Sequence, residues 1–172
     1  EDDVYAELNY DHQKPLPMSY FDQHRRVLHC SSFSKTLGMG TRIGCVHAGQ
    51  FSDAIQHLQL MSTLSASLLI QNALVDFLSL HHYEKHLRQL RGQLEKSKKK
   101  YYQYLKQNLP AGCSVDYYPS GYFLWISLPE TIDSFVIYTE LLSFNIGIAP
   151  SLLFMPKNAR QNFLRLNCSY VW

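Results

Sequence analysis

The chain has 172 residues, enough for one ordinary domain or two small ones. Hydrophobic residues make up 46%, which supports a packed core, and charged residues make up only 17%, which argues against a disordered tail. A formal net charge of +2 does not favour nucleic-acid binding by the chain as a whole, so any DNA contact would be local or would come from another part of the protein.

Short strands and helices alternate over the first 82 residues. Residues 26–34 predict a buried strand that runs into a polar turn, and residues 44–49 predict a second short strand bounded by glycines. Ser52 and Asp53 offer N-cap chemistry for a following helix. Apolar residues three and four positions apart predict another helix over 66–80.

A long amphipathic helix is predicted over residues 83–109. Its apolar side chains recur at spacings of three, four and seven, and Pro110 and Gly112 end it. The surrounding basic side chains are Lys85, Arg88, Arg91, Lys96, Lys98, Lys99 and Lys100. We interpret them as a solvated face with lysine stems lying on the surface, the alternative being contact with nucleic acid or an acidic partner.

The remainder of the chain favours strands. Residues 114–118 and 122–128 flank a turn at Pro119-Ser120-Gly121, a helix is expected over 133–143 from Asp133 and Ser134, and further strands are expected at 146–149 and 163–167. We therefore expect an α/β fold of two parts, the end of one α/β unit over residues 1–82 and a smaller α+β unit over residues 83–172.

The cysteines bear on location and metal binding. Cys30, Cys45, Cys113 and Cys168 form no CxxC pair, and no His/Cys group has metal-site spacing. We expect free thiols in a cytoplasmic protein, most of them small core residues, and no bound metal. No apolar run approaches the length of a membrane span, so we expect no membrane partner. Because the chain starts at Glu1 rather than Met, we also expect it to be part of a longer protein.

Several side chains that can bind a phosphate lie close to Lys35 in the sequence. The lysine follows an apolar strand within a run of hydroxyl side chains that includes Ser32 and Ser34, and a glycine-rich loop leads from it to Arg42. Hydroxyls and an arginine bind phosphate well, and glycines let the backbone approach it. A lysine beside such a site can attack an aldehyde once its amine is neutral. Taken singly, a glycine-rich loop near a lysine serves a turn or a nucleotide phosphate as readily.

Three more residues extend this pattern. Asp2 and Tyr5 are three positions apart, and a carboxylate and a phenol are suitable partners for the ring nitrogen and ring hydroxyl of pyridoxal 5′-phosphate (PLP). Arg165 lies in an apolar strand, where its charge needs a partner such as a substrate carboxylate. The alternatives are a cap or turn for the Asp and Tyr pair and an internal carboxylate partner for Arg165.

The order of these motifs resembles the fold-type I PLP-dependent enzymes of the class I/II aminotransferase family. The similarity rests on Asp-x-x-Tyr (2–5), Ser-x-Ser-Lys-Thr-Leu (32–37), Gly-x-Arg-x-Gly (40–44), Ser-Gly-Tyr-Phe-Leu-Trp (120–125) and Leu-Arg-Leu-Asn (164–167). The resemblance implies the end of the large α/β domain plus the small α+β domain of that fold.

The resemblance also implies residue roles. Lys35 would form the Schiff base with PLP, Asp2 would pair with the pyridine nitrogen and Tyr5 with the ring hydroxyl. Ser32 and Arg42 would bind the phosphate, with Ser34 a weaker candidate, and Arg165 would bind the substrate carboxylate. In this family the site is commonly built at a homodimer interface, and residues 62–67 would approach the partner's phosphate.

A closer resemblance concerns the aminotransferase-like domain of MocR regulators, a branch of the GntR transcription factors. It rests on residues 1–8 (Glu-Asp-Asp-Val-Tyr-Ala-Glu-Leu), 29–37 (His-Cys-Ser-Ser-Phe-Ser-Lys-Thr-Leu) and 58–65 (Leu-Gln-Leu-Met-Ser-Thr-Leu-Ser). In that family an N-terminal winged helix-turn-helix binds DNA and the PLP domain senses an amino-acid-like effector. Met39, Tyr122 and Cys168 depart from the common pattern, and none of them removes a proposed PLP contact.

Three functions follow. The favoured one is a PLP-binding sensor domain of a transcriptional regulator, and the second is a catalytic aminotransferase that moves amino groups between an amino acid and a 2-oxo acid. The third is a structural fragment that no longer binds the cofactor. A winged helix upstream of Glu1 would select the regulator.

Overall fold

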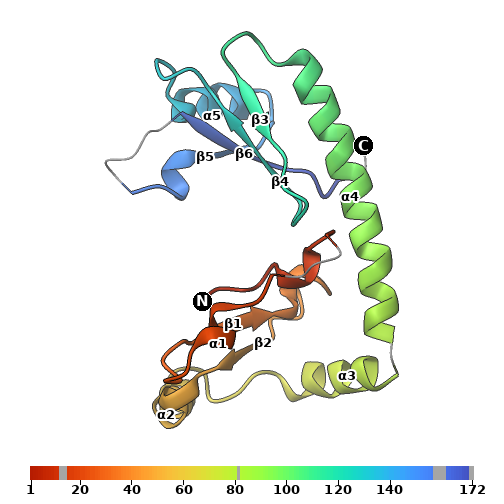
Figure 1. Ribbon diagram of the computed structural model, residues 1–172, viewed down its shortest axis with the longest axis vertical. Helices are drawn as coiled ribbons and strands as arrows, with labels where there is room; N and C mark the ends of the chain where they lie inside the picture. The colour runs from red at the N-terminus through yellow and green to blue at the C-terminus, as the bar shows by residue number, and fades with distance from the viewer. Residues whose placement is uncertain (12–14, 81, 157–161, 171–172) are drawn as a thin grey trace. The chain divides into compact units, whose positions relative to one another are not determined.

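The computed structural model describes residues 1–11, 15–80, 82–156 and 162–170. The chain divides into two compact units, Glu1–Arg91 and Gly92–Trp172, and α4 (His82–Asn108) runs from the first into the second (Figure 1). The α4 bounds confirm the long helix expected over 83–109. No described helix combines the length and apolar character needed to cross a membrane.

The first unit is built on a small hairpin. Strands β1 (His29–Ser32) and β2 (Gly44–His47) pair antiparallel, with His29 opposite His47 and Ser32 opposite Gly44. The N-terminal segment runs parallel to β1, because the Asp3 amide donates to the Cys30 carbonyl at 2.9 Å and the Cys30 amide donates to the Glu1 carbonyl at 2.9 Å. The two strands expected here are present, with shorter bounds, but the expectation that the first is buried is wrong, because Cys30 and Ser31 are exposed.

Short helices complete this unit. They are α1 (Met18–Phe21), α2 (Ser52–Thr63), α3 (Leu68–Ser79) and the 3₁₀ helices η1 (Ala6–Leu8), η2 (Phe33–Lys35) and η3 (Gly49–Phe51). The expected cap of α2 is wrong, because the Ser52 hydroxyl donates to the Gly49 carbonyl instead of accepting from the helix. The carboxylate of Glu1 receives the first amides of α1, from Met18 and Ser19.

The second unit contains a four-stranded antiparallel sheet in the order β3-β4-β6-β5 (Figure 1). The strands are β3 (Ser114–Asp116), β4 (Phe123–Ser127), β5 (Ala149–Pro150) and β6 (Phe163–Asn167), with α5 (Ser134–Ser143) and the 3₁₀ helix η4 (Ser151–Leu153) beside them. Asp133 caps α5 as expected, accepting from the Phe135 amide at 2.8 Å. The strand expected at 146–149 is wrong, because only Ala149 and Pro150 pair with β6.

The sheet has one buried face and one partly open face. Leu124, Ile126 and Leu164 are 0%, 5% and 4% exposed, and the register places them on the same side. Phe123, Trp125 and Arg165 alternate with them and therefore lie on the other side. This alternation places an arginine and two aromatic rings together on the less covered face.

Lys98 does not belong to the solvated basic face that was expected on this helix. Its side chain is 1% exposed, and its ammonium donates to the carbonyls of Tyr118 and Ser120 at 2.8 and 2.7 Å. The ring of Tyr117 lies 5.2 Å from the same nitrogen. The neighbouring Lys99 remains exposed. Lys98 therefore anchors the turn between β3 and β4 rather than contacting solvent or nucleic acid.

We expect Lys98 to make stability depend on pH. Burial lowers the pKa of its ammonium from 10.5 to about 8. Between these two values the unfolded chain binds the proton and the folded chain does not. Stability should therefore rise with pH across this window, by roughly 3 kcal/mol at most. Urea unfolding of the complete protein at pH 7.5 and 9.5 measures this, and Lys98→Met should remove the rise. The exposed control Lys96→Met should keep it, and identical pH profiles for both variants would contradict the assignment.

The cysteines differ from the expectation of mostly core residues. Only Cys168 is buried, Cys113 is half-buried, and Cys30 and Cys45 are exposed, all four as free thiols. Burial raises the pKa of the Cys168 thiol to about 12, so it stays protonated. Across the part of the chain that the structure describes, no three His, Cys, Asp or Glu side chains gather as metal ligands.

Candidate functional site

The parallel pairing of the N-terminal segment with β1 sorts the side chains of the first unit onto two faces. Successive residues of a strand point to opposite faces. Asp2 and its bridge partner Cys30 therefore share one face with Ser32, whereas Asp3, His29 and Ser31 belong to the other. Two of the predicted cofactor ligands, Asp2 and Ser32, thus lie on the same face.

Lys35 and Tyr5 emerge at the same end of these parallel segments. Tyr5 immediately precedes η1, and Lys35 is the last residue of η2, which follows β1. The Lys35 amine lies 5.6 Å from the centre of the Tyr5 ring. In open α/β sheets ligands bind beyond the carboxyl ends of the strands, which is where this pair lies.

The predicted phosphate ligands surround the turn that carries Lys35. The Ser32 hydroxyl accepts from the Ser34 amide at 3.1 Å and donates to the Ile43 carbonyl at 3.4 Å, and Ser34 is buried. Arg42 is exposed with a positive φ of 46°, and it makes no ion pair with any described residue. Gly44, opposite Ser32, comes so close to the hairpin partner that a Cβ there would lie 2.6 Å from the Ser31 carbonyl oxygen.

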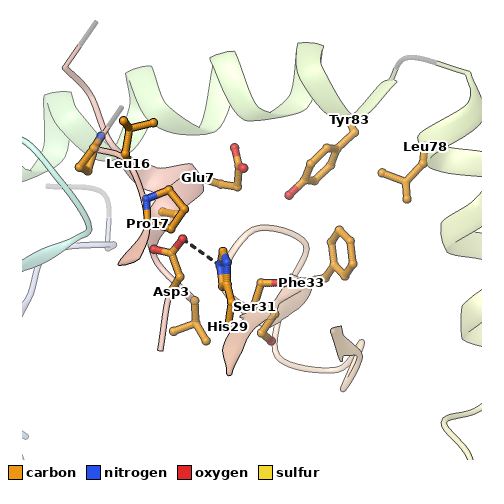
Figure 2. Close-up of a pocket in the computed structure, with 13 residues that line it drawn as sticks. Asp3, Glu7, Leu16, Pro17, His29, Ser31, Phe33, Leu78 and Tyr83 are labelled. Carbon is orange, nitrogen blue, oxygen red and sulfur yellow. Dashed lines mark ion pairs between the residues drawn. The ribbon is translucent and has the colours of Figure 1, made fainter. Parts of the chain in front are cut away.

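The opposite face carries a pocket of about 500 Å³. Figure 2 shows Asp3, Glu7, His29 and Tyr83 around it, with a carboxylate oxygen of Asp3 3.2 Å from the His29 Nε2. The His29 Nδ1 in turn lies 3.1 Å from the Ser19 hydroxyl. Neither Asp2 nor Lys35 lines this pocket, whereas Ser32, the last residue of β1, does. The Asp3–His29 ion pair fastens the N-terminal segment to β1, which keeps the neighbouring Asp2 in register.

Contacts from α4 to the Lys35 turn were missed from the sequence. The Tyr83 hydroxyl donates to the Thr36 hydroxyl at 3.2 Å, and the His86 Nε2 donates to the Thr36 carbonyl at 2.6 Å. Burial raises the pKa of the Tyr83 phenol, so it remains a donor. The only signal in the sequence was that polar residues stood among the apolar positions of this helix. These bonds fix the residue that directly follows Lys35.

Arg91 is a further correction to the solvated basic face of α4. Its guanidinium donates to the Glu7 carbonyl at 2.6 Å and to the Glu7 carboxylate at 2.9 Å. Glu7 belongs to η1, which follows Tyr5. The arginine therefore positions the segment that carries Tyr5.

Arg165 occupies β6 in the second unit, opposite Trp125 of β4 and Ala149 of β5. Its Nε is buried and has no hydrogen-bond partner among the described residues, which also provide no carboxylate within 4.0 Å. Within those residues, the alternative of an internal carboxylate partner is not realised. A buried N–H without an acceptor is costly, which favours an acceptor supplied by a ligand.

A parallel segment with a carboxylate, a lysine beside a phenol and a strand arginine are features of PLP-dependent transferases, and the family comparison agrees. The chain belongs to the class I and II aminotransferase family, whose model matches residues 1–169. A kynurenine aminotransferase from Pyrococcus horikoshii superposes with a TM-score of 0.91 at 26% identity, over 99% of this chain and 43% of that one. The predicted α/β fold class of the fold-type I transferases is confirmed.

Regulators are among the chain's relatives. The HTH-type transcriptional regulator YdcR of Escherichia coli is 48% identical over 172 residues, which is all of this chain and 37% of that protein. A second E. coli regulator, YjiR, is 31% identical over 98% of this chain and 36% of its own length. The chain thus spans little more than a third of these relatives, and the predicted resemblance to transcriptional regulators is confirmed.

Proposed function

We propose that this chain is the PLP-binding, effector-sensing domain of a GntR/MocR-type transcriptional regulator. The observation that carries the cofactor assignment is the meeting of the Lys35 amine and the Tyr5 ring beyond parallel segments that hold Asp2 and Ser32 on one face. The 48% identity to a helix-turn-helix regulator supports the regulatory role. Figure 1 shows the described elements that would form this domain.

The residues of the first unit fit PLP chemically. Lys35 makes no ion pair with a described carboxylate, so its amine is available to the aldehyde. Asp2 would hold the proton on the pyridine nitrogen, and Tyr5 would donate to the ring oxygen. Arg42, Ser32 and Ser34 would bind the phosphate, Arg42 through a charged fork. When bound, PLP supplies an electron-withdrawing ring that polarises an attached amine.

Arg165 would bind the carboxylate of an amino-acid-like effector. Its guanidinium is always charged and offers parallel N–H donors that match a carboxylate. The buried Nε without an acceptor supports this role. Recognition of the effector's carboxylate would therefore depend on Arg165.

DNA binding and dimerisation would involve other parts of the complete protein. The net charge of +2 gives this chain no general affinity for DNA, so we assign DNA contact to an N-terminal winged helix-turn-helix outside it. A homodimer would complete the cofactor site, with residues 62–67 approaching the partner's phosphate. We place the protein in the cytoplasm, where free thiols remain reduced.

A catalytic aminotransferase is the second candidate. It is favoured by the TM-score of 0.91 and 26% identity to a kynurenine aminotransferase whose structure was determined with PMP. All the proposed PLP ligands are of residue types that would serve catalysis equally well.

Binding of the complete protein to the DNA upstream of its own gene distinguishes the two functions. We expect a specific complex about 10³-fold tighter than that with unrelated DNA at the same salt concentration. The same preparation should show no sustained transfer of amino groups from the twenty standard amino acids to 2-oxoglutarate. Sustained turnover without specific DNA binding would instead establish the enzyme.

A further inference from the structure

Two aromatic rings from different elements pack against the guanidinium of Arg165. Its central carbon lies 4.2 Å from the ring centre of Phe123 and 3.9 Å from that of Phe154. Both distances are well within the range of cation–π attraction. Phe123 opens β4, whereas Phe154 follows η4, so the chain builds this arrangement from two separate segments.

The two rings offset part of the free-energy cost of burying the charge of Arg165. A half-buried cation without a carboxylate partner is costly, and an internal carboxylate would normally offset that cost. Such a partner would, however, occupy the N–H edge of the guanidinium. Aromatic rings attract the cation through their electron-rich faces and accept no in-plane hydrogen bond. They can therefore hold Arg165 while its N–H groups stay available to a ligand.

Both rings are held firmly in place. The sheet register puts Phe123 on the same face as Arg165, because Phe123 lies opposite Asn167, which is two residues from Arg165 along β6. The Phe154 amide donates to the Ser151 carbonyl at 2.9 Å, and the fully buried Ser151 and Ser134 hydroxyls are bonded at 3.0 Å. The rings of Phe154 and Trp125 also pack edge to face, with their centres 5.6 Å apart. Phe154 is nevertheless 39% exposed, so it remains at the surface a ligand would approach.

We propose that Phe123 and Phe154 form an aromatic clamp that positions Arg165 and makes it a receptor for planar carboxylates. This inference rests on the proposed carboxylate-binding role of Arg165 and adds the residues that determine it. The clamp fixes a long side chain in advance, so less rotamer entropy is lost when the ligand binds. It also restricts the ligand to the N–H edge, where a carboxylate or a phosphate can accept two parallel hydrogen bonds. The remaining oxygens of a tetrahedral anion would lie out of the guanidinium plane, toward the electron-rich faces of the two rings, which disfavours that anion relative to a planar carboxylate.

NMR of the complete protein labelled with ¹⁵N-arginine tests the clamp. The Arg165 Nε–H signal is assigned by its loss in Arg165→Lys. Acetate, a plain planar carboxylate, is then titrated against inorganic phosphate as the tetrahedral probe. We expect acetate to shift this signal and to bind tighter than phosphate does. Phe154→Leu should weaken acetate binding about fivefold, as expected for loss of one cation–π contact.

Phe144→Leu is the matched control, because Phe144 is an aromatic residue of the same unit that is 74% exposed. It should leave the Arg165 signal and acetate binding unchanged. Equal acetate affinity in the Phe154→Leu and Phe144→Leu proteins, preference for phosphate, or no acetate-dependent shift would each overturn the proposal. None of these measurements needs PLP, so failure of the cofactor assignment would appear separately, at Lys35.

Discussion

Lys35→Ala should abolish the covalent attachment of PLP to the complete protein. Incubation with PLP followed by borohydride reduction fixes the cofactor to the lysine that holds it, and mass spectrometry locates the modified peptide. In the unsubstituted protein we expect the label on the peptide that contains Lys35, because this amine lies beside Tyr5 and the predicted phosphate ligands. In Lys35→Ala the label should be lost completely, because no other amine can occupy that position.

Lys85→Ala is the matched control for this experiment. Lys85 is an exposed lysine on α4 in the same unit, and its replacement should leave trapping on Lys35 unchanged. Lys35→Arg keeps the positive charge but cannot form the bond, so it should behave like Lys35→Ala. A label of undiminished amount in Lys35→Ala protein would show that a different lysine holds the cofactor.

Arg165→Ala should weaken the binding of an amino-acid effector far more than it weakens the binding of PLP. Loss of charge-assisted hydrogen bonds to a carboxylate costs roughly 3 kcal/mol, or about 100-fold in affinity. The twenty standard L-amino acids can be titrated into the PLP-loaded protein and followed by the visible absorbance of the cofactor. Amines that lack the carboxylate should bind equally well to the substituted and unsubstituted proteins.

Arg88→Ala controls for the loss of one positive charge, because Arg88 is exposed on α4 and makes no ion pair with a described residue. Arg88→Ala should preserve the affinities for both PLP and amino acids. If Arg165→Ala weakens PLP and amino acids by the same factor, the arginine serves the stability of the sheet instead.

Local patterns in the sequence predicted most of the secondary structure. The three- and four-residue spacing of apolar side chains identified α3 and α4, and Asp133 identified the start of α5, because these signals depend only on near neighbours. Ser52 offered the same chemistry as Asp133 but bonds to Gly49, since the preceding 3₁₀ helix brings that carbonyl within reach. Residues 146–149 looked like a strand, yet the pairing with β6 begins only at Ala149.

Long-range contacts could not be derived from spacing alone. Lys98 belongs to a run of lysines, and its burial depends on two carbonyls about twenty residues away in the β3–β4 turn. Phe154 contacts Arg165 from a turn whose sequence carries no pattern that predicts the contact. Phe123 could have been expected, because it lies two residues from Trp125 in β4 and therefore on the same face of the sheet, next to the strand that carries Arg165. The predicted ligands Asp2, Tyr5, Ser32 and Lys35 came from motif order, and their roles toward PLP stay predictions.

The adjacent aspartates Asp2 and Asp3 are chemically identical but do not have the same environment. The pleat sends Asp2 to the face of Ser32 and Asp3 to the imidazole of His29. A one-residue slip of this segment along β1 in one direction would bring Val4 beside His29, whereas a slip in the other direction would bring Asp2 there. The His29 ion pair opposes the first slip, because Val4 has no carboxylate. The second slip is opposed instead at Glu1, whose carboxylate receives the Met18 and Ser19 amides only when the segment lies in the observed register.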